Sequence, residues 1–189
     1  MEVIIVVFAL VSLVGTYAQS PSSSCPEVSV VQNFNATGYL GKWYEQMKYP
    51  FIFELDAKCI SAEYSLNPNG TVRVLNQQIN IGTGHPNSIE GTARLDSTTG
   101  EAKLLVNFPT APIHFDSPYW VVATDYVSYS VVWSCAEVPL IGKSTHAWIL
   151  TRERNPSRDL IDKALSVFEK QHLSTTSLLT TDQQDCPKQ

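Results

Sequence analysis

The chain has 189 residues, of which 43% are hydrophobic and 16% charged, and its formal net charge is −5. This length is enough for one domain with a sizeable core, and the apolar content excludes a disordered chain. An acidic chain without a basic run is not expected to bind nucleic acid, and no segment after the N-terminus reaches the roughly 18 apolar residues that span a bilayer. We therefore expect a folded, moderately acidic domain.

The N-terminus has the pattern of a secretory signal peptide. Residues 3–14 form an apolar run, and the small residues Gly15 and Ala18 suit cleavage by signal peptidase. A helix of this length extends about 18 Å, which is shorter than a hydrocarbon core of about 30 Å, so a membrane anchor is disfavoured. We predict that residues 1–18 are removed, that residues 19–189 form a single domain, and that the protein is secreted and extracellular.

For a secreted protein, the cysteines are expected to form disulfides, and two tripeptides are expected to be glycosylation sites. The four cysteines are widely spaced without a CxxC pair, so an oxidising compartment predicts two disulfides, and spacing alone leaves three connectivities open. These cysteines are Cys25, Cys59, Cys135 and Cys186. The tripeptides that begin at Asn35 and Asn69 fit the N-glycosylation pattern, which predicts that both lie on the surface.

Short segments rich in Val, Ile, Tyr and Trp alternate with turn signals along most of the chain. Such spacing is typical of antiparallel sheets. We predict eight strands, at residues 42–48, 59–66, 71–79, 88–95, 101–108, 119–124, 129–135 and 145–152. Eight strands close a barrel that is either filled with side chains or holds one small ligand. The expected fold is therefore an all-β, eight-stranded antiparallel up-and-down barrel over about 39–152.

The apolar face of the second and third predicted strands continues into a polar residue. On the second strand this face comprises Ile60, Ala62, Tyr64 and Leu66. Val72 and Val74 continue it on the third strand, and the next residue on that face is Asn76. A buried amide without a hydrogen-bond partner costs about 1–3 kcal/mol. Asn76 therefore either has a structural partner or awaits a ligand.

One amphipathic helix is expected after the last strand, at about 156–172. Asn155 suits the N-cap and Pro156 the first helical position. The apolar stripe consists of Leu160, Ile161, Ala164, Leu165 and Phe168. We also expect an ion pair between Asp159 and Lys163, four residues apart, and a disulfide-tied C-terminal tail over 174–189.

Three separated motifs follow one another along the predicted barrel. They are Gly41-Lys42-Trp43 near the first strand, Thr124-Asp125-Tyr126 between the sixth and seventh strands, and Arg152 at the end of the eighth. Together with the signal peptide and the helix, they resemble the lipocalin family. The resemblance implies that these residues maintain the fold, with Trp43 plugging one end of the barrel. Arg152 would cover the indole ring and donate to backbone carbonyls.

Longer segments are similar to one branch of that family. Residues 39–45, 64–66, 74–77, 89–91, 118–120, 123–126, 133–135, 147–150 and 181–188 resemble the apolipoprotein D-like and Lazarillo-type lipocalins. The resemblance implies the disulfides Cys25–Cys135 and Cys59–Cys186. It also implies a carrier of a small hydrophobic ligand such as a lipid, fatty acid, sterol or retinoid.

The expected ligand-binding residues come from this resemblance and from the strand pattern. Tyr64, Asn76 and Trp148 match pocket positions of the branch, and Val72, Val74, Val106 and Tyr119 are expected walls. Ordinary core packing is the alternative for Tyr64 and Trp148, because aromatic residues often fill a barrel. Asn76 would make a single polar contact that orients the ligand.

Two apolar loops are expected at the mouth of the barrel, over residues 49–53 and 108–115. Their candidate contact residues are Phe51, Phe53, Ile113 and Phe115. Clustered apolar groups of this kind either touch a membrane or lipoprotein surface or fold inward as a lid.

Other functions of this branch remain open from sequence. Some lipocalins with these motifs bind a bilin pigment, and a Lazarillo-type protein would act in signalling or adhesion at a cell-surface receptor. No Gly-x-Ser-x-Gly or His-Glu-x-x-His motif is present, and all four cysteines match disulfide positions. We therefore expect that the protein is not an enzyme and binds no metal. The only cofactor expected is a non-covalently bound hydrophobic molecule, with a bilin as one candidate.

Overall fold

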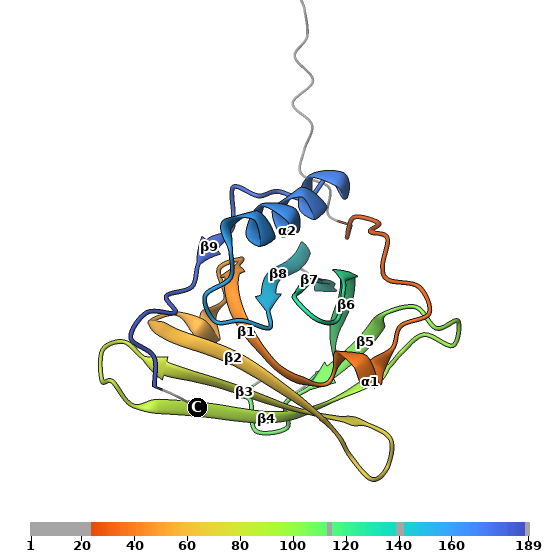
Figure 1. Ribbon diagram of the computed structural model, residues 1–189. Coiled ribbons are helices and arrows are strands. Elements are labelled where there is room, and N and C mark those ends of the chain that lie inside the picture. The colour runs from red at the N-terminus through yellow and green to blue at the C-terminus, as the bar shows by residue number, and fades with distance from the viewer. Residues whose placement is uncertain (1–23, 113–114, 139–141, 188–189) are drawn as a thin grey trace, which may run out of the picture.

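The protein forms a closed antiparallel β-barrel with one helix against its outer wall (Figure 1). The structure, a computed structural model, describes residues 24–112, 115–138 and 142–187, so the predicted signal peptide and Ile113 lie outside it. The barrel strands are β1 Gly41–Lys48, β2 Ala57–Leu66, β3 Val72–Asn80, β4 Pro86–Leu95, β5 Lys103–Asn107, β6 Ser117–Thr124, β7 Tyr129–Val138 and β8 Gly142–Thr151. Each strand pairs with the next, and β1 pairs with both β2 and β8, which closes the barrel. The predicted fold is confirmed, with strand ends shifted by a few residues.

The loops divide the barrel into two ends. The β1–β2, β3–β4 and β5–β6 loops meet at one end, which we call the mouth. The β2–β3, β4–β5 and β6–β7 loops meet at the other, which we call the closed end, together with the short helix α1 Ala36–Tyr39. Leu66 was expected on the inner face but is exposed, because β2 runs past the closed end into its turn with β3 (Figure 1).

The helix α2 Arg158–Lys170 lies across the outer wall and packs on β7. It begins later than the sequence predicts, because Ser157 is the N-cap and its side chain accepts a hydrogen bond from the backbone N–H of Leu160. The prediction of Asn155 as the cap is therefore wrong. Ala164 and Phe168 are fully buried, and the rest of the predicted stripe packs around them. In the described part of the chain, no helix is long and apolar enough to cross a bilayer.

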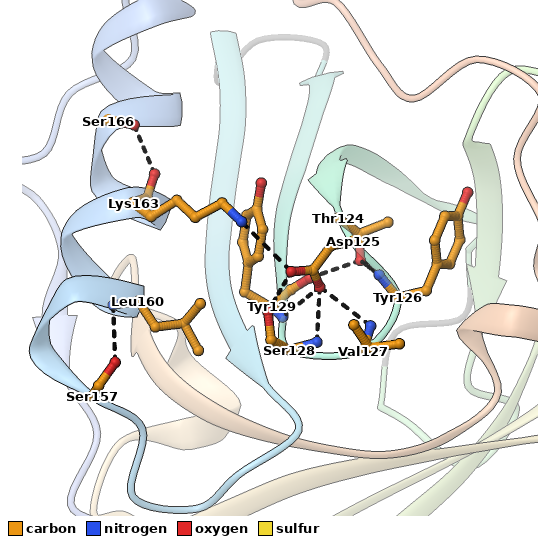
Figure 2. Close-up of polar contacts among 10 residues, drawn as sticks. All are labelled: Thr124, Asp125, Tyr126, Val127, Ser128, Tyr129, Ser157, Leu160, Lys163 and Ser166. Carbon is orange, nitrogen blue, oxygen red and sulfur yellow. Dashed lines mark hydrogen bonds and ion pairs between the residues drawn. The ribbon is translucent and has the colours of Figure 1, made fainter.

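Lys163 does not pair with its neighbour on the helix as expected. Its Nζ lies 3.5 Å from a carboxylate oxygen of Asp125, at the closed end of the barrel, and Figure 2 shows the side chain reaching across. The helical pair is instead Arg158 with Asp162, at 3.1 Å. Lys163 therefore pairs with Asp125 on the barrel and not with Asp159, the partner that the helical spacing predicts.

Two disulfides fix the terminal segments to the barrel. Cys25 is bonded to Cys135 on β7, and Cys59 on β2 is bonded to Cys186 in the tail. These are the pairs that the resemblance implies. The tail also adds the short strand β9 Leu179–Thr180 beside β1. Both ends of the described chain are thus held against the barrel wall.

The closed end is sealed by Trp43 and Arg152. Trp43 is fully buried, and its indole N–H donates to the carbonyl of Tyr39 at 2.9 Å. The Arg152 guanidinium lies 3.7 Å from the ring centre and donates to the carbonyls of Tyr126, Lys42 and Gly38. This is the cation–π contact and the set of carbonyl bonds that the resemblance implies.

The Thr124-Asp125-Tyr126 motif forms the tight turn between β6 and β7 (Figure 2). Asp125 Oδ1 accepts from the backbone N–H groups of Val127, Ser128 and Tyr129, and Oδ2 accepts from the Ser128 hydroxyl. Burial alone would raise the pKa of Asp125, but these hydrogen bonds outweigh it and lower the pKa to about 2. The carboxylate is therefore ionised and fixes the turn.

Candidate ligand-binding cavity

The mouth opens into a cavity with two adjoining lobes. The inner lobe has a volume of about 110 Å³ and the outer lobe about 230 Å³. Phe51, Glu54, Ile60, Asn76 and Phe108 line both lobes and mark the junction between them. The two lobes therefore adjoin along these five residues, with the outer lobe nearer the mouth.

Six of the seven residues expected to bind a ligand line the inner lobe. They are Tyr64, Val74, Asn76, Val106, Tyr119 and Trp148. The seventh, Val72, lies further toward the closed end, where it borders a small apolar space beside Leu104. Strand alternation placed Val72 on the correct face but could not show how deep the cavity extends.

A network of tyrosine hydroxyls forms the floor of the inner lobe. The hydroxyls of Tyr64 and Tyr119 lie 2.9 Å apart, and Tyr39 bonds to Tyr119 at 3.1 Å and to Ser130 at 2.8 Å. Burial raises the pKa of Tyr39 to about 12 and raises the pKa of Tyr64 and Tyr119 as well, so all three hydroxyls are neutral. Tyr64 and Tyr119 thus offer the cavity mainly their rings.

Asn76 lies between the lobes without a protein partner. It pairs with Ala62 of β2 and Ile89 of β4 in the sheet, and its side chain points toward the cavity that it lines. No hydrogen bond joins its side-chain amide to another described residue. The amide is therefore a free donor and acceptor at the junction of the lobes.

Phe108 reaches the junction because β4 leaves room for its ring. A Cβ atom at Gly91 would lie 2.6 Å from the Phe108 ring and 2.4 Å from the carbonyl oxygen of Asn107. Any side chain at Gly91 would therefore displace this wall of the cavity.

The outer lobe combines apolar loop residues with side-chain amides. Its amide and hydroxyl groups come from Gln77, Gln78, Asn87, Ser88 and Ser117. Its apolar walls include Phe53, Ala111, Pro112 and Phe115. The sequence alone did not predict this lobe, because its lining combines the ends of β3, β4 and β6 with residues of two loops that have no periodicity.

Phe51 folds inward, as the lid alternative predicts. Its ring centre lies 4.7 Å from that of His146 and 6.0 Å from that of Trp148. Burial lowers the pKa of His146, so the imidazole is held neutral beneath the phenyl ring. Phe53 and Phe115 differ from Phe51, because about half of each side chain is exposed.

Three charged side chains meet at the wall of the inner lobe. They come from β1 and from the short helix η1 Ile52–Glu54 in the β1–β2 loop. Lys48 Nζ lies 3.3 Å from Glu45 Oε1 and 3.1 Å from Glu54 Oε2, and it donates to the Glu54 carbonyl at 3.2 Å. Glu45 was not among the residues predicted from the sequence, although it lies two residues after Trp43 on the same face of β1.

Burial and the charge of Glu54 raise the pKa of Glu45 to about 8. Lys48 and the Thr181 hydroxyl, which donates to Glu45 Oε1, act in the opposite direction. A carboxyl group on the wall of an apolar cavity is therefore largely protonated at neutral pH.

The predicted glycosylation sites lie on the surface at the closed end. Asn35 is exposed and caps α1 by accepting from the backbone N–H of Gly38 at 3.0 Å. Asn69 is exposed in the β2–β3 turn, where its side chain accepts from Thr71. Sugars at either position would leave the mouth uncovered.

Comparison with known proteins gives consistent matches over most of the chain. A family model described as a lipocalin-like domain matches residues 34–183. Apolipoprotein D from Macaca fascicularis is 38% identical over 168 residues, which cover 87% of this chain and 85% of the relative. Lazarillo protein from Schistocerca americana is 34% identical over 178 residues, which cover 93% and 82%. The solved structure of insecticyanin from the tobacco hornworm Manduca sexta matches with a TM-score of 0.76 at 26% identity, covering 86% of this chain and 87% of that one.

Proposed function

The chain belongs to the lipocalin family, and we propose that it is a secreted carrier whose ligand occupies both lobes of the barrel cavity. The observation that carries this proposal is a largely apolar inner lobe with the Asn76 amide, which has no protein partner, at its junction with the outer lobe. The apolar part of the ligand lies in the inner lobe against Trp148 and the rings of Tyr64 and Tyr119. Its burial contributes about 25 cal/mol per Å² of apolar surface. Asn76 then orients the ligand through one hydrogen bond.

Filling the inner lobe tests this proposal. Ala62→Trp places a large side chain inside the cavity, whereas Thr92→Trp adds the same side chain on the exposed face of β4. We expect the first variant to weaken binding of the neutral fluorescent probe N-phenyl-1-naphthylamine by about tenfold or more, and the second to leave it unchanged. Equal binding by the wild type and a folded Ala62→Trp variant would exclude the inner lobe as the site.

Native mass spectrometry with organic extraction identifies the natural ligand. On organic extraction, protein secreted by the cells that naturally produce it should release a small hydrophobic molecule that fits the inner lobe. A bound bilin would give the same preparation visible absorbance. A coloured protein would therefore indicate that the ligand is a pigment and not a lipid.

A binding role without catalysis fits the state of the cysteines. All four cysteines of the chain are in disulfides, so the barrel contains no thiol that could act as a nucleophile. Both disulfides also agree with secretion, because such bonds persist in oxidising compartments. A thiol assay on the unreduced native protein should detect no free sulfhydryl, and detection of one would reopen an enzymatic role.

The mouth carries apolar side chains suited to a membrane or lipoprotein surface. The exposed ones on its loops are Ile52, Phe53, Leu55, Ile81 and Phe115. Because they surround the entrance to the cavity, contact with a lipid surface would let a ligand pass without crossing water. We propose this contact as the route of ligand entry.

Vesicle flotation tests the route with matched variants at the two ends. Phe53→Ser with Phe115→Ser changes the mouth, and Leu66→Ser with Leu95→Ser changes exposed residues of the closed end. We expect only the mouth pair to reduce binding to phosphatidylcholine vesicles. Equal effects of the two pairs would contradict contact through the mouth.

A further inference from the structure

The charged lining of the cavity is of one sign. Among the described residues that line either lobe, the charged side chains are Glu45 and Glu54. Glu45 borders the inner lobe, and Glu54 borders both lobes beside Asn76 and Phe51. A ligand that extends from one lobe into the other must therefore pass a carboxylate.

The two carboxyl groups share one ammonium. Lys48 Nζ lies within 3.3 Å of an oxygen of each, and its side chain is 9% exposed. Oε2 of Glu54 is buried and accepts no hydrogen bond from a described residue, although it lies 3.1 Å from Lys48 Nζ. With both carboxyl groups ionised, two carboxylates share one ammonium and the cluster carries a net charge of −1.

From this geometry, we propose that the cavity selects hydrophobic amines, with the ligand's ammonium group beside Glu54 and its hydrocarbon part in the inner lobe. The ligand's ammonium group supplies a second donor and a second positive charge, and the Asn76 carbonyl oxygen can accept one of its remaining N–H groups. A carboxylate ligand of the same length would instead add a further negative charge beside Glu54 in an apolar cavity, where like charges repel strongly. This inference rests on the proposed carrier function and specifies the ligand class of the same site.

Protonation of Glu45 gives this selection a pH dependence. The groups that act on Glu45 are Lys48 on its own strand, Glu54 on η1 and the Thr181 hydroxyl in the tail. Ser61 on β2 and Leu150 on β8 line the same lobe and carry no charge. A bound ammonium favours the ionised carboxylate, so amine binding releases a proton wherever Glu45 is protonated in the empty barrel. Affinity for the amine should then rise from about pH 6 to about pH 8.

Three ligands of equal length separate charge from hydrophobicity. We would measure decylamine, decanol and decanoate by displacement of N-phenyl-1-naphthylamine from the mature protein at pH 8. Decylamine should bind about tenfold more tightly than decanoate, with decanol between them. Equal affinity for decylamine and decanoate would overturn the inference.

Variants of single carboxyl groups locate the effect. Glu54→Gln should remove most of the preference for decylamine and change decanol affinity less than about twofold. Glu63→Gln is the matched control, because Glu63 lies on the outside of β2 with 44% of its side chain exposed. Equal losses of decylamine and decanol in Glu54→Gln would indicate a general distortion of the cavity and would contradict the inference.

Glu45→Gln provides a second test that does not depend on the folding of the first variant. This variant should abolish the rise of decylamine affinity with pH. If the rise persists, the proton released on amine binding does not come from Glu45, which would contradict the proposed pH dependence. Failure of the two proposals can be told apart. If decanol does not bind, the carrier proposal fails, whereas decanol binding without a preference for decylamine overturns only this inference.

Discussion

The closed end and the mouth of the barrel differ in whether their polar side chains have hydrogen-bond partners. At the closed end, Arg152 donates to several backbone carbonyls, and Asp125 accepts from three backbone N–H groups. At the mouth, Asn76 has no hydrogen-bond partner among the described residues, and a buried oxygen of Glu54 accepts none. Hydrogen bonding thus stabilises one end and leaves binding capacity at the other.

The same functional group titrates in opposite directions at the two ends. The Asp125 carboxylate at the closed end has its pKa lowered to about 2 by hydrogen bonds that favour the charged form. The pKa of the Glu45 carboxyl at the mouth is raised to about 8, chiefly by burial beside an apolar cavity. The comparison shows that burial raises a carboxyl pKa unless the backbone supplies donors.

Removing a tryptophan from each end should give the largest difference between them. Trp43→Ala leaves a void in a fully buried site and removes the ring beneath Arg152, so we expect a loss of about 3–5 kcal/mol. Trp148→Ala enlarges a cavity that already opens at the mouth and should cost less than half as much. Urea unfolding of both variants measures this difference. Equal losses would show that the two ends are packed alike.

Stability as a function of pH should reveal the buried carboxyl at the mouth. Folded Glu45 keeps its proton up to about pH 8, whereas in the unfolded chain it releases the proton near its ordinary pKa of 4.5. The folded state therefore binds more protons between these values, and its stability falls as pH rises through this window. Between about pH 5 and pH 8 the wild type should lose on the order of 3 kcal/mol of stability, and we expect Glu45→Gln to remove this loss.

Chemical unfolding at several pH values measures this slope. Glu63→Gln is again the control, because it removes an exposed carboxyl from the neighbouring strand. An unchanged slope in Glu45→Gln would mean that Glu45 is ionised in the folded protein. The contrast with Asp125 would then disappear.

Features set by strand alternation and by short motifs could be predicted from the sequence. Alternation placed Asn76 and Tyr64 on the inner face, because successive side chains of a strand point to opposite sides. The seal made by Trp43 and Arg152 followed from motifs that resemble a known family. The pairing of the cysteines depended on that resemblance, since their spacing permits three connectivities.

Features set by tertiary contacts could not be predicted in this way. Glu54 reaches the cavity because Lys48 binds both the carboxylate and the backbone carbonyl of Glu54, which fixes the β1–β2 loop. Lys163 pairs with Asp125 on the barrel, which no helical periodicity reveals. The prediction for Leu66 was wrong because alternation does not tell where a strand leaves the barrel.

The smallest effect is expected from the turn that fixes the closed end. Asp125→Ala leaves three backbone N–H groups in the β6–β7 turn without their acceptor, and partial exposure of the turn limits the expected loss to about 1 kcal/mol. Lys163→Met removes only the half-exposed ion pair and should cost less than about 0.5 kcal/mol. Because the pKa of Asp125 is lowered, its contribution is complete above its ordinary pKa of 3.8 and disappears as pH falls toward 2. Urea unfolding at pH 7 and in acid should therefore show the wild type and Asp125→Ala converging at low pH. A constant difference between them would show that the turn is held by contacts other than the carboxylate.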